Sequence, residues 1–187
     1  MYENFKYLNA VAQKEITNGV FSGSVLSVIH KGEIVYLKSF GLADKEKNIP
    51  MKTDSIFRLF SMSKPVTAAA AMILIERGLL DTRHPLKWFI PEFSDPVVLD
   101  ENGEHPADRD ITIGDLLTMT SGIPYPDGTP AGQKMGALWG GQSEKYLKGE
   151  KLLDTVSFAK EMGKRPLMFT PGEKWMYGAS ADIMGAV

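Results

Sequence analysis

The chain has 187 residues, of which 43% are hydrophobic and 24% charged, which is the size and composition of one soluble globular domain. Its net charge of −2 at pH 7 gives no reason to expect nucleic acid or an anionic membrane surface as a partner. The sequence contains no cysteine, which excludes disulfides, thiolate catalysis and cysteine-ligated metals.

The first residues contain no apolar run of the kind found in a signal peptide, and together with the lack of cysteine this slightly favours the cytoplasm. The longest apolar run, Val66 to Ile75, is too short to cross a bilayer, so no membrane span is expected. No histidine or acidic spacing suggests a metal site, and no glycine pattern suggests a nucleotide cofactor.

The first third of the chain predicts a helix and a hairpin. Apolar residues recur every three or four positions from Phe5 to Ile16, which predicts an amphipathic helix that ends at Asn18-Gly19. The runs SVLSVIH and EIVYLKSF flank Lys31-Gly32 and predict two strands joined by a tight turn. Residues Leu59 to Gly78 are almost wholly apolar after their first turn, and we expect a buried helix that Gly78 terminates.

The remainder predicts short helices and one long loop. We expect a helix capped by Thr112, an amphipathic helix over Leu152–Met162 and a last helix beginning at Ala181. Residues 121–141 hold six glycines and three prolines, and we expect a long loop that lines a binding site. The last residues, IMGAV, are apolar and uncapped. We therefore expect the chain to be the N-terminal part of a longer protein, whose C-terminal remainder forms a second segment or chain.

The pattern Ser-x-x-Lys can bring a nucleophile and a base together, but it is weak evidence alone. It occurs twice, at Ser61 with Lys64 and at Ser157 with Lys160. Ser157 lies within the predicted amphipathic helix, where a solvated lysine is expected. Pro65 is tolerated only in the first turn of a helix, so Ser61 lies at or next to the N-cap. Ser61 could simply cap the helix while Lys64 extends to water, and the residues by themselves favour that interpretation.

Three longer blocks change this balance. FRLFSMSKPVTAAAAMILIERGLLD, ITIGDLLTMTSGI and FTPGEKWMYGASADIMG resemble, in order and spacing, the signature blocks of the serine β-lactamase-like superfamily. That superfamily includes class C β-lactamases, D-Ala-D-Ala peptidases and family VIII carboxylesterases. The resemblance implies an α+β fold, an α/β sandwich of the β-lactamase/transpeptidase type, in which an antiparallel sheet is flanked by helices and joined by a helical subdomain. We expect residues 1–187 to form one such domain, incomplete at its C-terminus, with a helix and hairpin in 1–60 and a mostly helical part in 61–187.

The resemblance also implies roles for three residues. Ser61 resembles the acylated serine, Lys64 the lysine that activates it, and Tyr177 the tyrosine of the second motif, usually Tyr-x-Asn. Here Ala179 replaces the asparagine, which in β-lactam-cleaving members contacts the substrate amide. The departure favours a carboxylic ester or related small acyl substrate over a β-lactam or a peptidoglycan peptide, although β-lactamase or D-Ala-D-Ala peptidase activity remains the alternative.

The third motif of the superfamily, which supplies part of the oxyanion hole, is not found after Tyr177. The letters Trp139-Gly140-Gly141 match one form of it, but they precede Tyr177, and we expect them to belong to the loop. Two bases are compatible with the sequence. Lys64 could be neutral, which requires its pKa to fall by about 3.4 units from about 10.4, or its charge could stabilise a Tyr177 phenolate.

Two other functions compete with an Ser-Lys-Tyr hydrolase. A Ser-His-Asp hydrolase would need a nucleophile elbow. The sequence has three histidines but contains no Gly-x-Ser-x-Gly. A binding or sensor domain of the same fold would be acylated once at Ser61 and stop, or would not react at all. A burst without steady turnover would distinguish the sensor from the enzyme.

Overall fold

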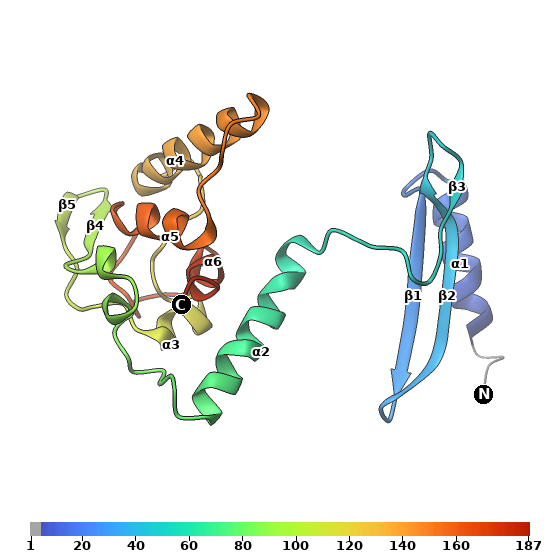
Figure 1. Cartoon of the computed structure of the whole chain (residues 1–187), viewed down its shortest axis with the longest axis horizontal. Coiled ribbons are helices and arrows are strands. Elements are labelled where there is room, and N and C mark those ends of the chain that lie inside the picture. Colours follow the sequence, from blue (N-terminus) through green and yellow to red (C-terminus); the bar gives the residue numbers. More distant parts are fainter. Residues whose placement is uncertain (1–4) are drawn as a thin grey trace. The chain divides into compact units, whose positions relative to one another are not determined.

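The computed structural model describes residues 5–187, which form two compact units, one ending at Leu59 and the other spanning Phe60–Val187 (Figure 1). The boundary lies next to the division at residue 60 that the sequence suggests. That the two units belong to one domain stays a prediction.

The first unit is a helix packed on an antiparallel sheet, which contains the predicted helix and hairpin and a short third strand that was not predicted. Helix α1 (Lys6–Thr17) is followed by strands β1 (Gly23–His30), β2 (Glu33–Asp44) and β3 (Ile49–Pro50), in the order β1-β2-β3. Lys31 and Gly32 both have positive φ, 52° and 82°, the backbone that a tight two-residue hairpin turn requires. The ring of Tyr36 on β2 contacts that of Phe5 at a tilt, and its hydroxyl donates to Asn9 Oδ1 at 2.7 Å, which holds α1 against the sheet.

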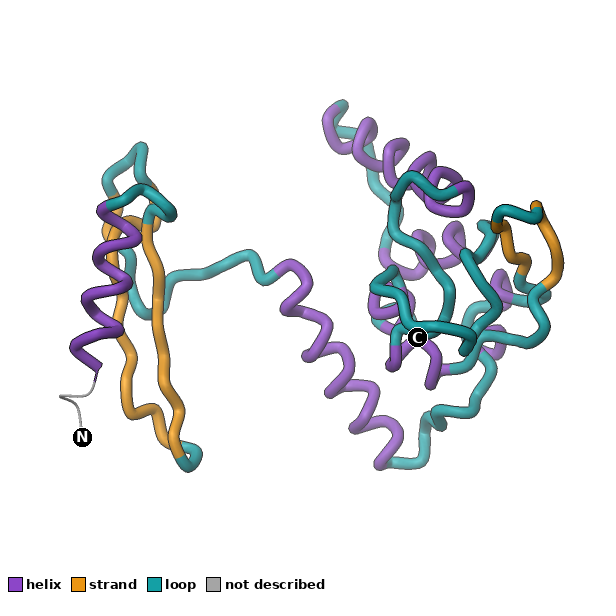
Figure 2. Tube along the Cα trace, turned by 180° about the vertical axis from the view of Figure 1, so that it is seen from behind, coloured by secondary structure: helices purple, strands orange, loops and turns teal. Residues whose placement is uncertain are grey.

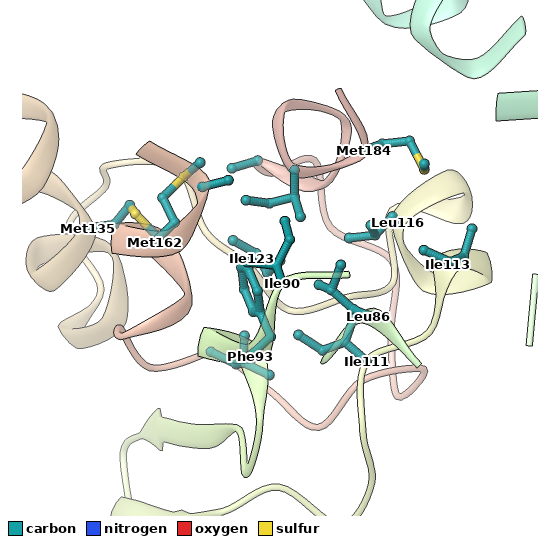
Figure 3. Close-up of a cluster of buried hydrophobic side chains, with 14 of the residues drawn as sticks. Leu86, Ile90, Phe93, Ile111, Ile113, Leu116, Ile123, Met135, Met162 and Met184 are labelled. Atoms are coloured by element: carbon teal, nitrogen blue, oxygen red, sulfur yellow. The ribbon is translucent and has the colours of Figure 1, made fainter. Parts of the chain in front are cut away.

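The second unit consists of short helices around one apolar core, with one small hairpin (Figure 2). Its elements are η2 (Phe60–Met62), α2 (Ser63–Glu76), η3 (Leu86–Trp88), η4 (Pro91–Phe93), β4 (Val97–Asp100), β5 (Gly103–Pro106), α3 (Ile113–Thr118), α4 (Pro130–Leu147), α5 (Thr155–Gly163) and α6 (Ser180–Met184). Figure 3 shows the side chains that gather at its centre, among them Leu86, Ile90, Phe93, Ile111, Leu116 and Ile123. None of the helices within residues 5–187 combines the length and apolarity that crossing a membrane requires.

Helix α2 forms where the sequence predicts, but it is not the buried helix that we expected. Gly78, with φ of 69°, follows its C-cap Arg77 and ends it. Of its side chains only Ala71 is buried, whereas Val66 and Ile73 are 66% and 47% exposed. Apolar composition predicts a preference for burial, but burial itself needs packing partners. Within the described residues, α2 packs through one face, against α6 and the core.

The predicted loop over residues 121–141 is wrong in its second half, because residues 130–147 form helix α4. Thr129 caps this helix by accepting a hydrogen bond from the Gly132 backbone N–H at 3.1 Å, and Pro130 occupies its first turn. Ala131, Met135 and Leu138 then recur on one buried face. The capped start and this apolar face outweigh the helix-weakening effect of the glycines. Residues 121–129 remain a loop.

The remaining helices begin at or close to the positions that the sequence predicts. Thr112 caps α3 with a reciprocal pair of hydrogen bonds to Asp115, as predicted for Thr112. Helix α5 begins three residues later than we expected, because Asp154 caps it by accepting from the Ser157 N–H at 2.7 Å. Helix α6 begins at Ser180, next to the predicted position.

Candidate active site

Ser61 and Lys64 are brought together at the start of α2. Ser61 lies in the 3₁₀ turn η2, immediately before Met62, which is the N-cap of α2. No side chain caps this helix; the Ser61 hydroxyl instead accepts a hydrogen bond from Lys64 Nζ at 3.1 Å. A serine that only capped the helix and a lysine that only extended to water would not make this contact. Lys64, half-buried, therefore faces the nucleophile candidate.

Tyr177 reaches the same hydroxyl from a distant part of the sequence. Its phenol oxygen lies 2.7 Å from Ser61 Oγ, and the Lys64 ammonium lies 5.0 Å from the centre of its ring. The backbone holds Tyr177 in place, because the N–H of the preceding Met176 donates to the Met119 carbonyl at 2.9 Å. All three residues predicted from the sequence thus meet at one point.

Tyr125 and Asp182 complete the site, and the sequence analysis did not identify either. Lys64 Nζ donates to the Tyr125 hydroxyl at 3.0 Å, and that hydroxyl donates to Asp182 Oδ2 at 2.6 Å. The Tyr125 ring contacts those of Trp139 and Tyr177, with centroids 5.8 and 5.9 Å apart. The available signal was position: Tyr125 lies in the glycine- and proline-rich loop that we expected to line a binding site.

The loop that carries Tyr125 is fixed to the segment that carries Tyr177 and Asp182. The Ala179 N–H donates to the Ile123 carbonyl at 3.1 Å, and the buried hydroxyls of Ser121 and Ser180 are 2.8 Å apart. Gly178 is needed at this approach, because a Cβ there would overlap the Ile123 carbonyl oxygen. A backbone hydrogen bond and a pair of buried hydroxyls therefore fix the relative position of the two segments.

The surroundings of Lys64 and Tyr177 shift the pKa values of these two residues in opposite directions. Burial alone would lower the pKa of Lys64, but its hydrogen bonds with Tyr125 and Tyr177 outweigh burial and raise that pKa above 10.5. The hydrogen bonds that Tyr177 makes with Ser61 and Lys64 lower its pKa below 10.0. Burial and the Asp182 carboxylate raise the pKa of Tyr125, which stays a neutral phenol. The fall in the pKa of Lys64 that a neutral-lysine base requires is therefore not found.

The other sequence candidates lie apart from the Ser61 hydroxyl. Trp139, Gly140 and Gly141 belong to helix α4 and not to a loop, and only the Trp139 ring approaches the site, through Tyr125. Within residues 5–187, the hydrogen bonds to Ser61 Oγ come from Lys64 and Tyr177 and none comes from a histidine. In the same part of the chain, no three His, Cys, Asp or Glu side chains group as metal ligands would.

This geometry can be compared with known proteins. The model of the beta-lactamase family matches residues 8–187. The chain belongs to this family. Esterase EstB from Burkholderia gladioli is 35% identical over 183 residues, which are 96% of this chain and 43% of that esterase. Penicillin-binding protein 4* from Bacillus subtilis is 31% identical over 170 residues, 89% of this chain and 32% of that protein.

A solved structure confirms the predicted fold. The structure titled EstCE1, a hydrolase with promiscuous acyltransferase activity, superposes with a TM-score of 0.78 at 28% identity, over 97% of this chain and 45% of that one. The expected α+β fold of the β-lactamase/transpeptidase type is thus confirmed for this family member. The chain spans less than half the length of these relatives.

Proposed function

We propose that this family member is a serine hydrolase that cleaves carboxylic esters or related small acyl compounds through an acyl-enzyme at Ser61, with Lys64 and Tyr177 as its partners. The observation that carries the proposal is the double contact of the Ser61 hydroxyl, 3.1 Å from Lys64 Nζ and 2.7 Å from the Tyr177 phenol oxygen. A serine hydroxyl becomes a useful nucleophile only when a neighbouring group accepts its proton, and both contacts lie within the distance of proton transfer.

Tyr177 is the better candidate for that base. The direction of its pKa shift favours the phenolate, while the opposite shift at Lys64 favours the ammonium. The ammonium then stabilises the phenolate and, later, the negative charge that develops on the substrate. Tyr177 is therefore the proton acceptor in this proposal, and Lys64 stabilises negative charge.

The chemistry follows from these positions. The Ser61 oxygen attacks the acyl carbon as its proton passes to Tyr177, and the resulting oxyanion faces the Ser61 backbone N–H. Tyr177 then returns the proton to the leaving alkoxide as the ester bond breaks, which leaves the acyl group on Ser61. A water molecule attacks this acyl-enzyme, gives one proton to Tyr177 and releases the carboxylic acid, while Ser61 recovers its proton.

The second motif supports an ester over a β-lactam. Ala179 occupies the asparagine position and is fully buried, so its methyl group cannot contact a substrate amide. Esterase EstB and lovastatin esterase from Penicillium rubens are similar at 35% and 33% identity. Penicillin-binding protein 4* is similar as well, which makes β-lactam cleavage the second outcome to test.

The decisive experiment uses the full-length protein. We expect steady hydrolysis of a short-chain p-nitrophenyl ester, slower turnover of a chromogenic cephalosporin, and loss of both in Ser61→Ala. Mass spectrometry of the quenched reaction should place the acyl group on Ser61. Faster cephalosporin turnover would assign the protein to the β-lactam-cleaving members instead. A single burst without turnover would indicate the sensor, and full activity of Ser61→Ala would refute the proposal.

A further inference from the structure

The contacts of Tyr125 lead beyond the three motif residues. We propose that Asp182, acting through Tyr125, is a positioning residue that fixes the Lys64 amine on the Ser61 hydroxyl and keeps it charged. The inference rests on the proposed function, since it concerns the same nucleophile. Asp182 lies within the third sequence block without being one of its motif residues, and Tyr125 lies two residues after the second block.

A continuous chain of hydrogen bonds carries the inference. It runs from Asp182 Oδ2 to the Tyr125 hydroxyl at 2.6 Å, from there to Lys64 Nζ at 3.0 Å, and on to Ser61 Oγ at 3.1 Å. Its members come from α6, the loop after α3, α2 and η2. The chain therefore connects four separate elements of the second unit.

Asp182 decides how the Tyr125 hydroxyl is oriented. A phenol has one proton, and the short contact with a carboxylate, which can only accept, commits that proton to Asp182. The Tyr125 oxygen then presents only lone pairs to Lys64, so it accepts and cannot donate. Without the carboxylate, the hydroxyl could rotate and turn its proton toward the amine. Asp182 thus makes the Tyr125 hydroxyl an acceptor for the Lys64 amine.

Lys64 needs such a partner because its side chain is long and flexible. A lysine amine on a four-carbon stem adopts many rotamers and normally extends into water. One acceptor on Tyr125 and one on Ser61 hold the amine between them. The groups that act most on its charge are Tyr125 and Tyr177, from two loops, and the Asp182 carboxylate on α6. The hydrogen bonds with the two phenols and the negative charge of Asp182 favour the ammonium over the neutral amine.

The Tyr125 ring is held independently of its hydroxyl. It contacts the Trp139 ring edge-on and the Tyr177 ring at a tilt. Tyr125→Phe therefore removes the hydrogen bonds and keeps the packing. Asp182→Asn keeps an oxygen that can accept from Tyr125 and removes the charge. Tyr125→Phe therefore tests the hydrogen bonds of the Tyr125 hydroxyl, and Asp182→Asn tests the negative charge of Asp182.

The test is a double-mutant cycle in the full-length protein, with ester hydrolysis measured from pH 6 to the alkaline limit of substrate stability. We expect Asp182→Asn and Tyr125→Phe each to lower kcat about tenfold with KM nearly unchanged, because each weakens the hydrogen-bonded contact that positions the Lys64 amine. The double variant should lose no more than the more damaging single variant, because both changes break one chain. In each variant the alkaline limb of the pH profile should move to lower pH, since Lys64 loses its proton more easily.

Two matched controls and the thermal unfolding of each variant complete the design. Tyr36→Phe removes a tyrosine hydroxyl that bonds Asn9, and Asp110→Asn removes a carboxylate that pairs with Lys87 at 2.7 Å. Both should leave kcat and the pH profile unchanged. Losses that multiply in the double variant, or an unmoved alkaline limb, would overturn the inference. If Asp182→Asn fails to fold, the alkaline limb of Tyr125→Phe decides alone. Activity that survives Ser61→Ala would instead reject the proposed function itself.

Discussion

The phenol oxygen of Tyr177 lies 2.7 Å from Ser61 Oγ, although 116 positions separate the two residues in the sequence. The contact exists because α2 and the segment before α6 meet beside the same core. We expect Tyr177→Phe to lower kcat/KM for a p-nitrophenyl ester by about 10²–10⁴-fold, the usual contribution of a general base. Circular dichroism and thermal unfolding should be unchanged, because the exposed ring stays in place. Wild-type activity in this variant would exclude Tyr177 as the base.

The second prediction uses the two Ser-x-x-Lys patterns of the chain as a matched pair. Lys64→Met should lower kcat by about 10²–10⁴-fold, since it removes the charge beside Ser61. Lys160→Met changes the same residue type in the other pattern, where Lys160 lies on the exposed side of α5, 3.8 Å from Glu92. It should leave steady-state kinetics unaltered. Equal losses in both variants would show that the loss at Lys64 is not specific to the site.

The third prediction concerns pH. If Tyr177 acts as a phenolate beside a charged Lys64, kcat/KM rises with pH through the pKa of Tyr177, which lies below 10.0. It falls again only as Lys64 loses its proton, above 10.5. The pH profile of the full-length protein should therefore be a bell shifted to alkaline pH, and Tyr177→Phe should abolish its rising limb. A neutral Lys64 base would give the opposite behaviour on the alkaline side, because activity would still rise through the pKa of the lysine.

Stability should depend on the buried carboxylate of Asp115. This residue is 5% exposed and accepts hydrogen bonds from both terminal nitrogens of Arg109, at 2.7 and 2.8 Å, and from Thr112 and Thr120. Asp115→Ala should lower the free energy of unfolding by about 2–3 kcal/mol, because it leaves these donors without a partner. Urea denaturation measures the change. Asp81→Ala, which breaks an exposed ion pair with Arg83, should have little effect.

The same carboxylate sets a pH dependence of stability. Burial alone would raise the pKa of Asp115, but the hydrogen bonds from Arg109 and Thr112 outweigh it and lower the pKa in the folded state. The stabilisation is therefore present above the unfolded value of about 3.9 and is lost as the pH falls through the folded value. Asp115→Ala should flatten the decrease in stability between pH 5 and pH 2. An unchanged decrease would contradict the assignment.

The last prediction compares two glycines. Gly178→Ala should lower the free energy of unfolding by about 1–3 kcal/mol, because the added Cβ meets the Ile123 carbonyl oxygen. It should also lower kcat, since the displaced backbone carries Tyr177. Gly140→Ala lies in helix α4 with open space around it and should raise stability by about 0.5–1 kcal/mol. Thermal unfolding of both variants checks the pair, and a stabilising Gly178→Ala would contradict the close approach.

Local sequence patterns predicted the elements whose causes are local. The tight turn at Lys31-Gly32, the Thr112 cap and the Gly78 stop each depend on a few neighbouring residues, and all three are confirmed. The sequence analysis missed helix α4 because it considered the glycines of this segment and did not consider the Thr129 cap or the apolar face that is buried. The exposure of α2 could not be predicted, because burial depends on what packs against the helix.

The residues of the candidate site also fall into two groups, three that were predicted from the sequence and two that were not. Ser61, Lys64 and Tyr177 were predicted from blocks that resemble a family, and the structure places their functional atoms together. Tyr125 and Asp182 were not predicted, because the position of Tyr125 in the expected binding loop and of Asp182 in the third block does not show which side chains they contact. Their importance appears only when contacts between residues 57 and 61 positions apart are known.

All five side chains of the site lie on the C-terminal side of the boundary at Leu59. The hydrogen bonds that join these five side chains all run between residues of the second unit, Phe60–Val187. Every side chain that the proposed proton transfer uses is thus encoded in one contiguous stretch, Phe60–Val187.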